Sequence, residues 1–157
     1  MTAAGHREAH QDYGRRADVS MPRDLAKRRK AAGYVAIAAI GLDAEPGVYL
    51  LGAAEDIDVL LSRLQRGTWH ELYFVRAVWT PGLAVARTIV AGAEGALTEA
   101  GYALAPHWYR VGLDVLDTAI EKERAKLRSP VWSNAELAAK LRRQSHAEVD
   151  RFAAGII

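Results

Sequence analysis

Three stretches of the chain have the apolar pattern of buried β-strands. Residues 34–40 are apolar at every position, which is typical of a short buried strand. Residues 48–51 are also apolar and follow a turn at residues 41–47, so these two strands are expected to form a hairpin. Residues 71–79 are rich in aromatic and β-branched side chains and are followed by Pro81. The pattern therefore predicts three strands.

Helical periodicity occupies most of the remaining chain. In the clearest case, apolar residues recur at intervals of three and four from Ile57 to Leu64, which makes one buried stripe of a helix ending near Gln65. Either Asp56 or Glu55 can cap the first turn of that helix. The helices expected from the whole sequence cover residues 23–32, 57–65, 83–100, 112–127, 135–143 and 147–153.

Capping residues mark the ends of several of these helices. Ser20 is a candidate N-cap of the first helix, and Ser133 or Asn134 of the helix that begins at residue 135. Gly33 and Gly101 follow the last residues of two helices, where a left-handed backbone conformation commonly ends the helical turn. The boundaries of these helices are therefore predicted by local chemistry as well as by periodicity.

The elements together predict an α/β (α+β) fold, with a small three-stranded sheet flanked by helices and extra helices at both ends. We expect residues 1–32 to form a basic tail and a short helix, residues 33–128 the folded domain, and residues 129–157 a helical extension. Residues 1–20 are polar and lack periodicity, which favours a mobile tail. His6 and His10 lie in that tail, so their spacing of four predicts no metal site.

Composition excludes several chemistries. The chain has no cysteine, so it has neither disulfides nor thiolate metal sites nor a cysteine nucleophile. No apolar run reaches the roughly 18 residues that a membrane-spanning helix needs, and the N-terminus has no apolar signal core. We therefore expect a soluble, cytoplasmic protein that does not partner a membrane.

The charges of the chain are unevenly distributed. Residues 1–32 carry a net charge of +4, residues 33–120 of −5, and residues 121–157 of +3. Contacts with DNA phosphates need Lys or Arg, so any binding of DNA is expected to depend on the two ends. The alternative is that these charged runs are merely solvated. The candidate DNA-contacting residues are Arg23, Lys27, Arg28, Arg29, Lys30, Arg63, Arg66, Arg142 and Arg143.

The order of several short motifs resembles that of a known family. Leu51-Gly52 closes the second strand, the following helix leads into Gln65-Arg66-Gly67, and Trp108-Tyr109-Arg110-Val111 comes much later. This order is similar to the GIY-YIG nuclease superfamily, especially its phage-type branch described as a DNA-binding domain. The resemblance covers residues 33–121, and it implies that the three-stranded sheet is mixed. It also implies a setting in a phage, plasmid or other mobile element.

The resemblance also indicates which positions should carry chemistry. Members of the family use a tyrosine on each of the first two strands, an arginine on the first helix and a metal-binding glutamate on the next long helix. The corresponding positions here are Ala36, Leu50, Leu60, and Val90 or Ala91. Because none of these side chains can donate, accept or ligate, the sequence predicts a pseudoenzyme without a cofactor, which serves as a binding module.

Two other functions stay open. Tyr49, Arg63 and Glu94 lie near the degenerate positions and could form a divergent active site that cleaves DNA with Mg²⁺. The chain could also be a protein–protein adaptor without a nucleic-acid role.

Some further residues allow two interpretations. The four tryptophans, Trp69, Trp79, Trp108 and Trp132, could stack on unpaired bases, although tryptophans more often fill cores. His70 beside Glu71 is either an acid–base pair or, as we prefer, a histidine at a strand edge. Residues 134–141 resemble the first helix of a helix-turn-helix, but no turn glycine follows them.

Overall fold

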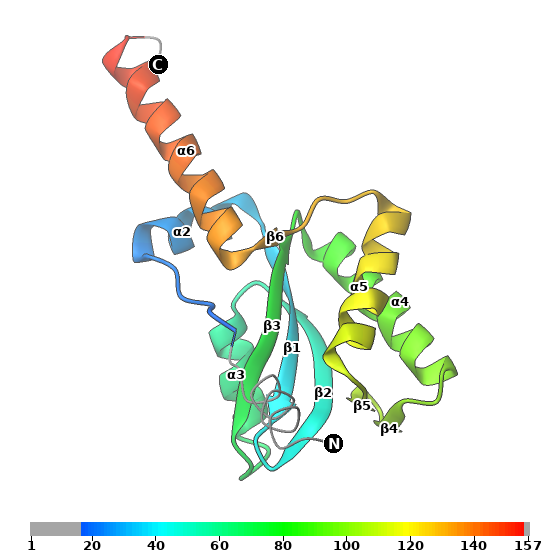
Figure 1. Cartoon of the computed structure of the whole chain (residues 1–157). Helices are drawn as coiled ribbons and strands as arrows, with labels where there is room; N and C mark the ends of the chain where they lie inside the picture. Colours follow the sequence, from blue (N-terminus) through cyan, green and yellow to red (C-terminus); the bar gives the residue numbers. More distant parts are fainter. Residues whose placement is uncertain (1–16, 156–157) are drawn as a thin grey trace, which may run out of the picture.

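The computed structural model describes residues 17–155, and the positions of His6 and His10 lie outside that range. The described chain forms one antiparallel sheet of six strands in the order β4-β5-β2-β1-β3-β6 (Figure 1). The strands are β1 (Val35–Leu42), β2 (Glu45–Ala54), β3 (Leu72–Thr80), β4 (Ala103–Ala105), β5 (Trp108–Arg110) and β6 (Trp132–Ser133). The helices are α2 (Arg23–Ala32), α3 (Ile57–Gln65), α4 (Leu83–Glu99), α5 (Leu113–Leu127) and α6 (Asn134–Ala153).

The sheet is larger than the sequence predicts, and the expectation of a three-stranded mixed sheet is wrong. The three expected strands are present as β1, β2 and β3. In addition, β5 extends the sheet beyond β2, where Leu50 lies opposite Trp108. At the other edge β6 pairs with β3 through Trp79 and Trp132. The additional strands have only two or three residues each. Strands this short contain too few positions for apolar alternation to reveal them.

The helix caps largely follow local sequence. The Asp56 carboxylate accepts the backbone N–H of Val59 at 3.2 Å, which caps α3. Ser133 caps α6 in a capping box with Glu136. The expectation for Ser20 is wrong, because the N-cap position of α2 is held by Pro22 and Ser20 instead donates hydrogen bonds to Asp18.

The C-terminal extension is one continuous helix. α6 runs without interruption through residues 144–146, where the sequence suggested a break between two helices. Gln, Ser and His are tolerated inside helices, and neither Gly nor Pro occurs there to stop the turn. The continuity of α6 leaves no helix-turn-helix at this position.

Two apolar cores lie on opposite faces of the sheet. Alternate residues of β1 point in opposite directions, so that Ile37 and Ala39 pack toward α4 and α5, whereas Ala38 and Ile40 pack in the other core. The second core contains side chains of α2, α3 and α6. Figure 1 shows α4 and α5 together on one side of the sheet, and α6 extending away from the body of the domain. The uniformly apolar β1 is thus explained by burial on both faces.

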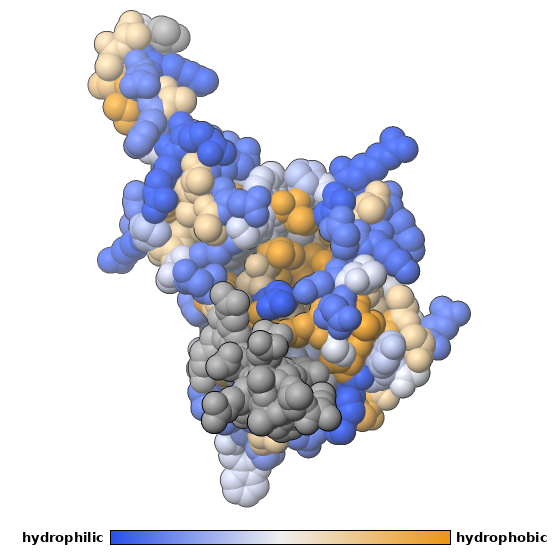
Figure 2. Space-filling model, viewed as in Figure 1, coloured by the Kyte–Doolittle hydropathy of each residue, from blue (hydrophilic) through white to orange (hydrophobic). Residues whose placement is uncertain are grey.

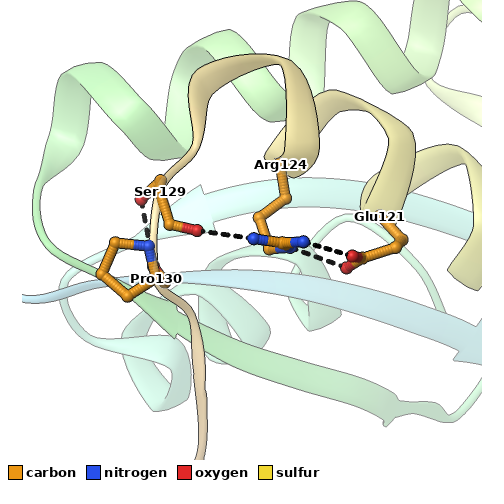
Figure 3. A network of polar contacts seen from close by, with 4 residues as sticks. All are labelled: Glu121, Arg124, Ser129 and Pro130. Atoms are coloured by element: carbon orange, nitrogen blue, oxygen red, sulfur yellow. Dashed lines mark hydrogen bonds and ion pairs between the residues drawn. The ribbon is translucent and has the colours of Figure 1, made fainter.

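A polar network fixes the connection from α5 back to the sheet (Figure 3). Arg124 donates to the Glu121 carboxylate at 2.8 Å and to the Ser129 carbonyl at 3.0 Å. Arg128, in the left-handed conformation, forms the C-cap of α5. The chain is thereby turned toward β6, which leads directly into α6.

Trp79 joins the terminal helices to the sheet. Its side chain is fully buried, and its Nε1 donates to Oδ1 of Asn134 at 3.2 Å. The guanidinium of Arg29 from α2 lies 4.2 Å above the Trp79 ring. Asn134 in turn donates through Nδ2 to the carbonyl of Ser20. One buried contact set therefore links β3, α2, α6 and the segment before α2.

We expect Asn134→Ala to lower the free energy of unfolding by about 1–3 kcal/mol, because it leaves the buried Trp79 Nε1–H without its acceptor. Chemical denaturation followed by circular dichroism measures this change. The exposed α6 residue Gln144 provides the matched control, since Gln144→Ala removes a side chain of similar size from the same helix. Equal stability of the two variants would contradict the assigned role of Asn134.

Candidate nucleic-acid interface

α2 carries the densest positive charge of the described chain. It contains five Lys or Arg residues and one Asp. Leu25 and Arg29 are its buried residues and hold it against the sheet. Arg23 and Lys27 are exposed, and no ion pair to either is found between residues 17 and 155. Both side chains are therefore available to an anionic partner.

α6 brings a second set of basic side chains next to α2, although more than a hundred residues separate the two helices in sequence. Nη1 of Arg28 contacts Oε2 of Glu148 at 2.9 Å, which links the two helices. Arg142 and Arg143 are exposed on α6. The structure thus brings together basic residues that the sequence placed at opposite ends of the chain.

α3 extends this basic region along the same face of the sheet. Arg63 and Arg66 line a shallow hollow of about 470 Å³ together with Asp56 and Asp58. Nζ of Lys30 contacts Oδ2 of Asp56 at 2.8 Å and so joins α2 to α3. The hydrogen bond from Lys30 holds the pKa of Asp56 below its ordinary value, despite an opposing effect of partial burial.

The two faces of the molecule differ in charge. Within their helical bounds, α2, α3 and α6 contain ten Lys or Arg against five Asp or Glu. α4 and α5 contain four against six. Figure 2 shows hydrophilic residues over much of α2 and α6, with apolar side chains gathered between these helices and the α4–α5 pair. A polyanion is therefore attracted to one side of the sheet and repelled by the helices of the other.

Arg29 does not belong to this interface. Its side chain is buried under α2 against the Trp79 ring, with only 6% of the residue exposed. Burial lowers the pKa of its guanidinium, although the nearby Asp56 and Asp58 partly offset that effect. This burial conflicts with the prediction that Arg29 contacts DNA. The sequence suggested the contact because composition alone cannot distinguish a buried arginine from an exposed one.

The positions that the GIY-YIG resemblance assigns to catalysis do not converge on one cleft. Ala36, Leu50 and Leu60 belong to the apolar core shared with α2, α3 and α6. Val90 belongs to the core on the opposite face. The sheet thus separates the position that would bind the metal from the other three.

The three residues of the alternative, divergent active site are divided in the same way. Tyr49 is buried in the core beneath α4, and Glu94 projects from α4 on that side. Arg63 lies on α3, whose apolar residues pack against the opposite core. The structure therefore does not bring the three residues into one site.

Glu94 instead takes part in a cluster that the sequence analysis did not identify. Oε2 of Glu94 lies 2.7 Å from Nδ1 of His107 and accepts the Tyr109 hydroxyl at 3.0 Å. These side chains line a hollow of about 420 Å³ at the β4–β5 turn. His107 has a φ of 69°, a conformation that is uncommon for a residue with a side chain.

The Glu94 cluster can position a histidine for proton transfer, since a carboxylate fixes one ring nitrogen. Burial is the main factor that raises the pKa of Tyr109, and the neighbouring Glu94 charge adds to it. In the sequence, the one sign of this cluster is that His107 and Tyr109 flank Trp108. Only the hairpin of β4 and β5 brings these two side chains to Glu94 on α4.

The tryptophans have different environments. Trp79 is buried, whereas Trp108 and Trp132 are half-buried, and Trp132 packs edge-on against Tyr34. Trp69 alone among the four is almost wholly in solvent, with 98% of the residue exposed. His70 and Glu71 are exposed neighbours just before β3, so His70 lies at a strand edge.

A comparison of the chain with known protein families, with curated proteins and with solved structures finds no match to any of them. In the part of the chain from 17 to 155, no helix is both long and apolar enough to cross a membrane. Within the same residues, no three histidine or acidic side chains come together as a metal-ion site.

The contribution of Asp56 to stability should depend on pH. Because its pKa is lower in the folded than in the unfolded chain, its stabilising effect is present above its unfolded pKa of about 3.9 and is lost as the pH falls through the folded-state value. We expect the difference in unfolding free energy between the wild type and Asp56→Ala to be constant above about pH 5 and to shrink below about pH 4. Urea denaturation at several pH values tests this, with the exposed turn variant Asp43→Ala as control.

Proposed function

We propose that this chain is a DNA-binding module, related to the GIY-YIG nucleases but without their cleavage chemistry. The proposal rests on one observation: α2, α3 and α6 pack on the same side of the sheet. Nine basic residues are predicted from the sequence to contact DNA, and eight of them lie on these helices or at their ends and are exposed or half-buried. Arg29 is the exception.

The chemistry of this face suits a phosphate backbone. Contacts between Lys or Arg and phosphates release counterions, which supplies most of the affinity for DNA. Lys27, Arg142 and Arg143 are exposed and have no ion-pair partner in residues 17–155, so binding breaks no ion pair within that range. The more acidic α4 and α5 on the opposite side favour one orientation of the module on DNA.

The absence of cleavage chemistry is supported by the placement of the family positions. Hydrolysis of a phosphodiester needs a metal-bound oxygen and a cation at the same phosphate. Val90, in place of the family's glutamate, lies across the sheet from Leu60, which replaces the arginine. Glu94 and Arg63 of the divergent active site are separated by the same sheet.

We expect DNA binding to weaken steeply with salt and to depend on the exposed residues of α2 and α6. Simultaneous replacement of Lys27, Arg142 and Arg143 by alanine should reduce the slope of log K against log salt by about 2–3, since each phosphate contact contributes about 0.9. Titrations of labelled DNA between about 50 and 200 mM salt measure this slope. The matched control replaces Lys122 and Lys126 of α5, on the other side of the sheet, and should leave the slope unchanged.

We expect supercoiled plasmid to stay intact when it is incubated with the protein and Mg²⁺ or Mn²⁺. Agarose electrophoresis over several hours detects nicking at low levels. Nicking by the wild type that disappears in both Arg63→Ala and Glu94→Ala would support the divergent endonuclease instead.

The adaptor function is favoured by one different observation. Val149 and Phe152 on the projecting end of α6 are 62% and 74% exposed. Exposed apolar side chains on an amphipathic helix are common in protein interfaces. If the wild type shows no salt-dependent binding of DNA, and Phe152→Ala abolishes recovery of a protein partner, the adaptor replaces DNA binding as the function.

A further inference from the structure

The loop between α3 and β3 is held in place by the side chain of Gln65. Its Nε2 donates to the carbonyl of His70 at 2.8 Å and to that of Thr68 at 3.3 Å. Its Oε1 accepts the backbone N–H of Leu72 at 3.0 Å. The Thr68 hydroxyl also accepts the backbone N–H of His70 at 3.1 Å. These bonds on both sides of residue 69 keep the loop in one shape before any ligand binds.

This ordered loop presents Trp69 to solvent. At 98% exposure, Trp69 makes almost no contact with the rest of the described chain, whereas the other three tryptophans are buried or half-buried. Covering such a large aromatic surface is strongly favourable, and a braced loop loses little conformational entropy when it binds. Trp69 therefore has the properties of a preorganised stacking surface.

The nearest basic residues to Trp69 in sequence belong to α3 and its C-cap, and α3 packs on the same face of the sheet as α2 and α6. Arg63 and Arg66 are exposed at the end of α3, three to six residues before Trp69. Thr68 and His70 line an apolar hollow of about 400 Å³, whose wall includes Leu50 and Trp108. Cations for a sugar-phosphate backbone thus lie within six residues of an exposed aromatic side chain whose loop also lines an apolar recess, the combination that binds single-stranded nucleic acids.

We propose that Trp69 stacks on an unpaired base, so that the module prefers single-stranded DNA, or duplex DNA with an unpaired segment, to fully paired duplex. The inference rests on the proposed DNA-binding function and specifies its ligand. In a continuous duplex the faces of the bases are already stacked on one another, and an indole gains access to them only by unstacking a step. An unpaired base offers its face without that cost.

The test compares binding of a labelled oligo-dT strand and of a mixed-sequence duplex of the same length at one salt concentration. Trp69→Ala should weaken binding of the single strand by roughly 5- to 150-fold, the range for loss of one stacked base, and binding of the duplex less than about 2-fold. Trp69→Phe retains an aromatic face and should keep most of the affinity. Tyr102→Ala, a change to a partly exposed aromatic residue after α4, is the matched control and should bind as the wild type does.

Fluorescence gives an independent readout. Addition of oligo-dT should quench the tryptophan emission of the wild type, and this quenching should disappear in Trp69→Phe although three tryptophans remain. Unchanged binding of the single strand by Trp69→Ala, or an equal loss for both DNAs, overturns the inference and leaves DNA binding itself in place. If the wild type binds neither DNA, the proposed function fails and the inference fails with it.

Discussion

The buried contact of Trp79 with Asn134 and Arg29 is the constraint on which the candidate interface depends. The indole needs an acceptor because it is removed from water, and Asn134 supplies one from the first turn of α6. The guanidinium of Arg29 on α2 covers the Trp79 ring and is therefore too buried to contact a phosphate. Two basic helices from opposite ends of the chain are thereby anchored to the same residue of β3. This interior contact, together with the Arg28–Glu148 ion pair, holds their exposed charges on one face.

The central sheet divides the molecule into two sides of different chemistry. Because side chains alternate along β1, each face has its own apolar core and its own helices. The basic helices α2 and α6 share one side with α3, and the more acidic α4 and α5 occupy the other. The same division separates Arg63 from Tyr49 and Glu94. A fold of this kind can concentrate positive charge on one surface while it prevents residues of the two faces from acting on a common phosphate.

Elements with strong local signals were predictable. Periodicity and capping chemistry, which depend only on residues close together in sequence, predict the α3 helix, its Asp56 cap and the long central strands. The short strands β4, β5 and β6 were not predictable, because each is stabilised by pairing with a distant strand and not by its own pattern. The joining of residues 135–143 and 147–153 into one helix shows a further limit. A polar stretch without Gly or Pro permits a helix to continue, but it has no apolar periodicity that would show the continuation.

The candidate site likewise has features that were predictable from the sequence and features that were not. The sequence by itself determined the residue types: an excess of Lys and Arg at both ends, apolar groups at the positions that the proposed relationship assigns to catalysis, and four tryptophans. Only the tertiary structure decided which of these residues are at the surface and which lie together. It buried Arg29 and Trp79, exposed Trp69, and brought Glu94 to His107 and Tyr109. The physical reason is that charge and polarity belong to single residues, whereas burial and proximity arise from packing between segments far apart in the chain.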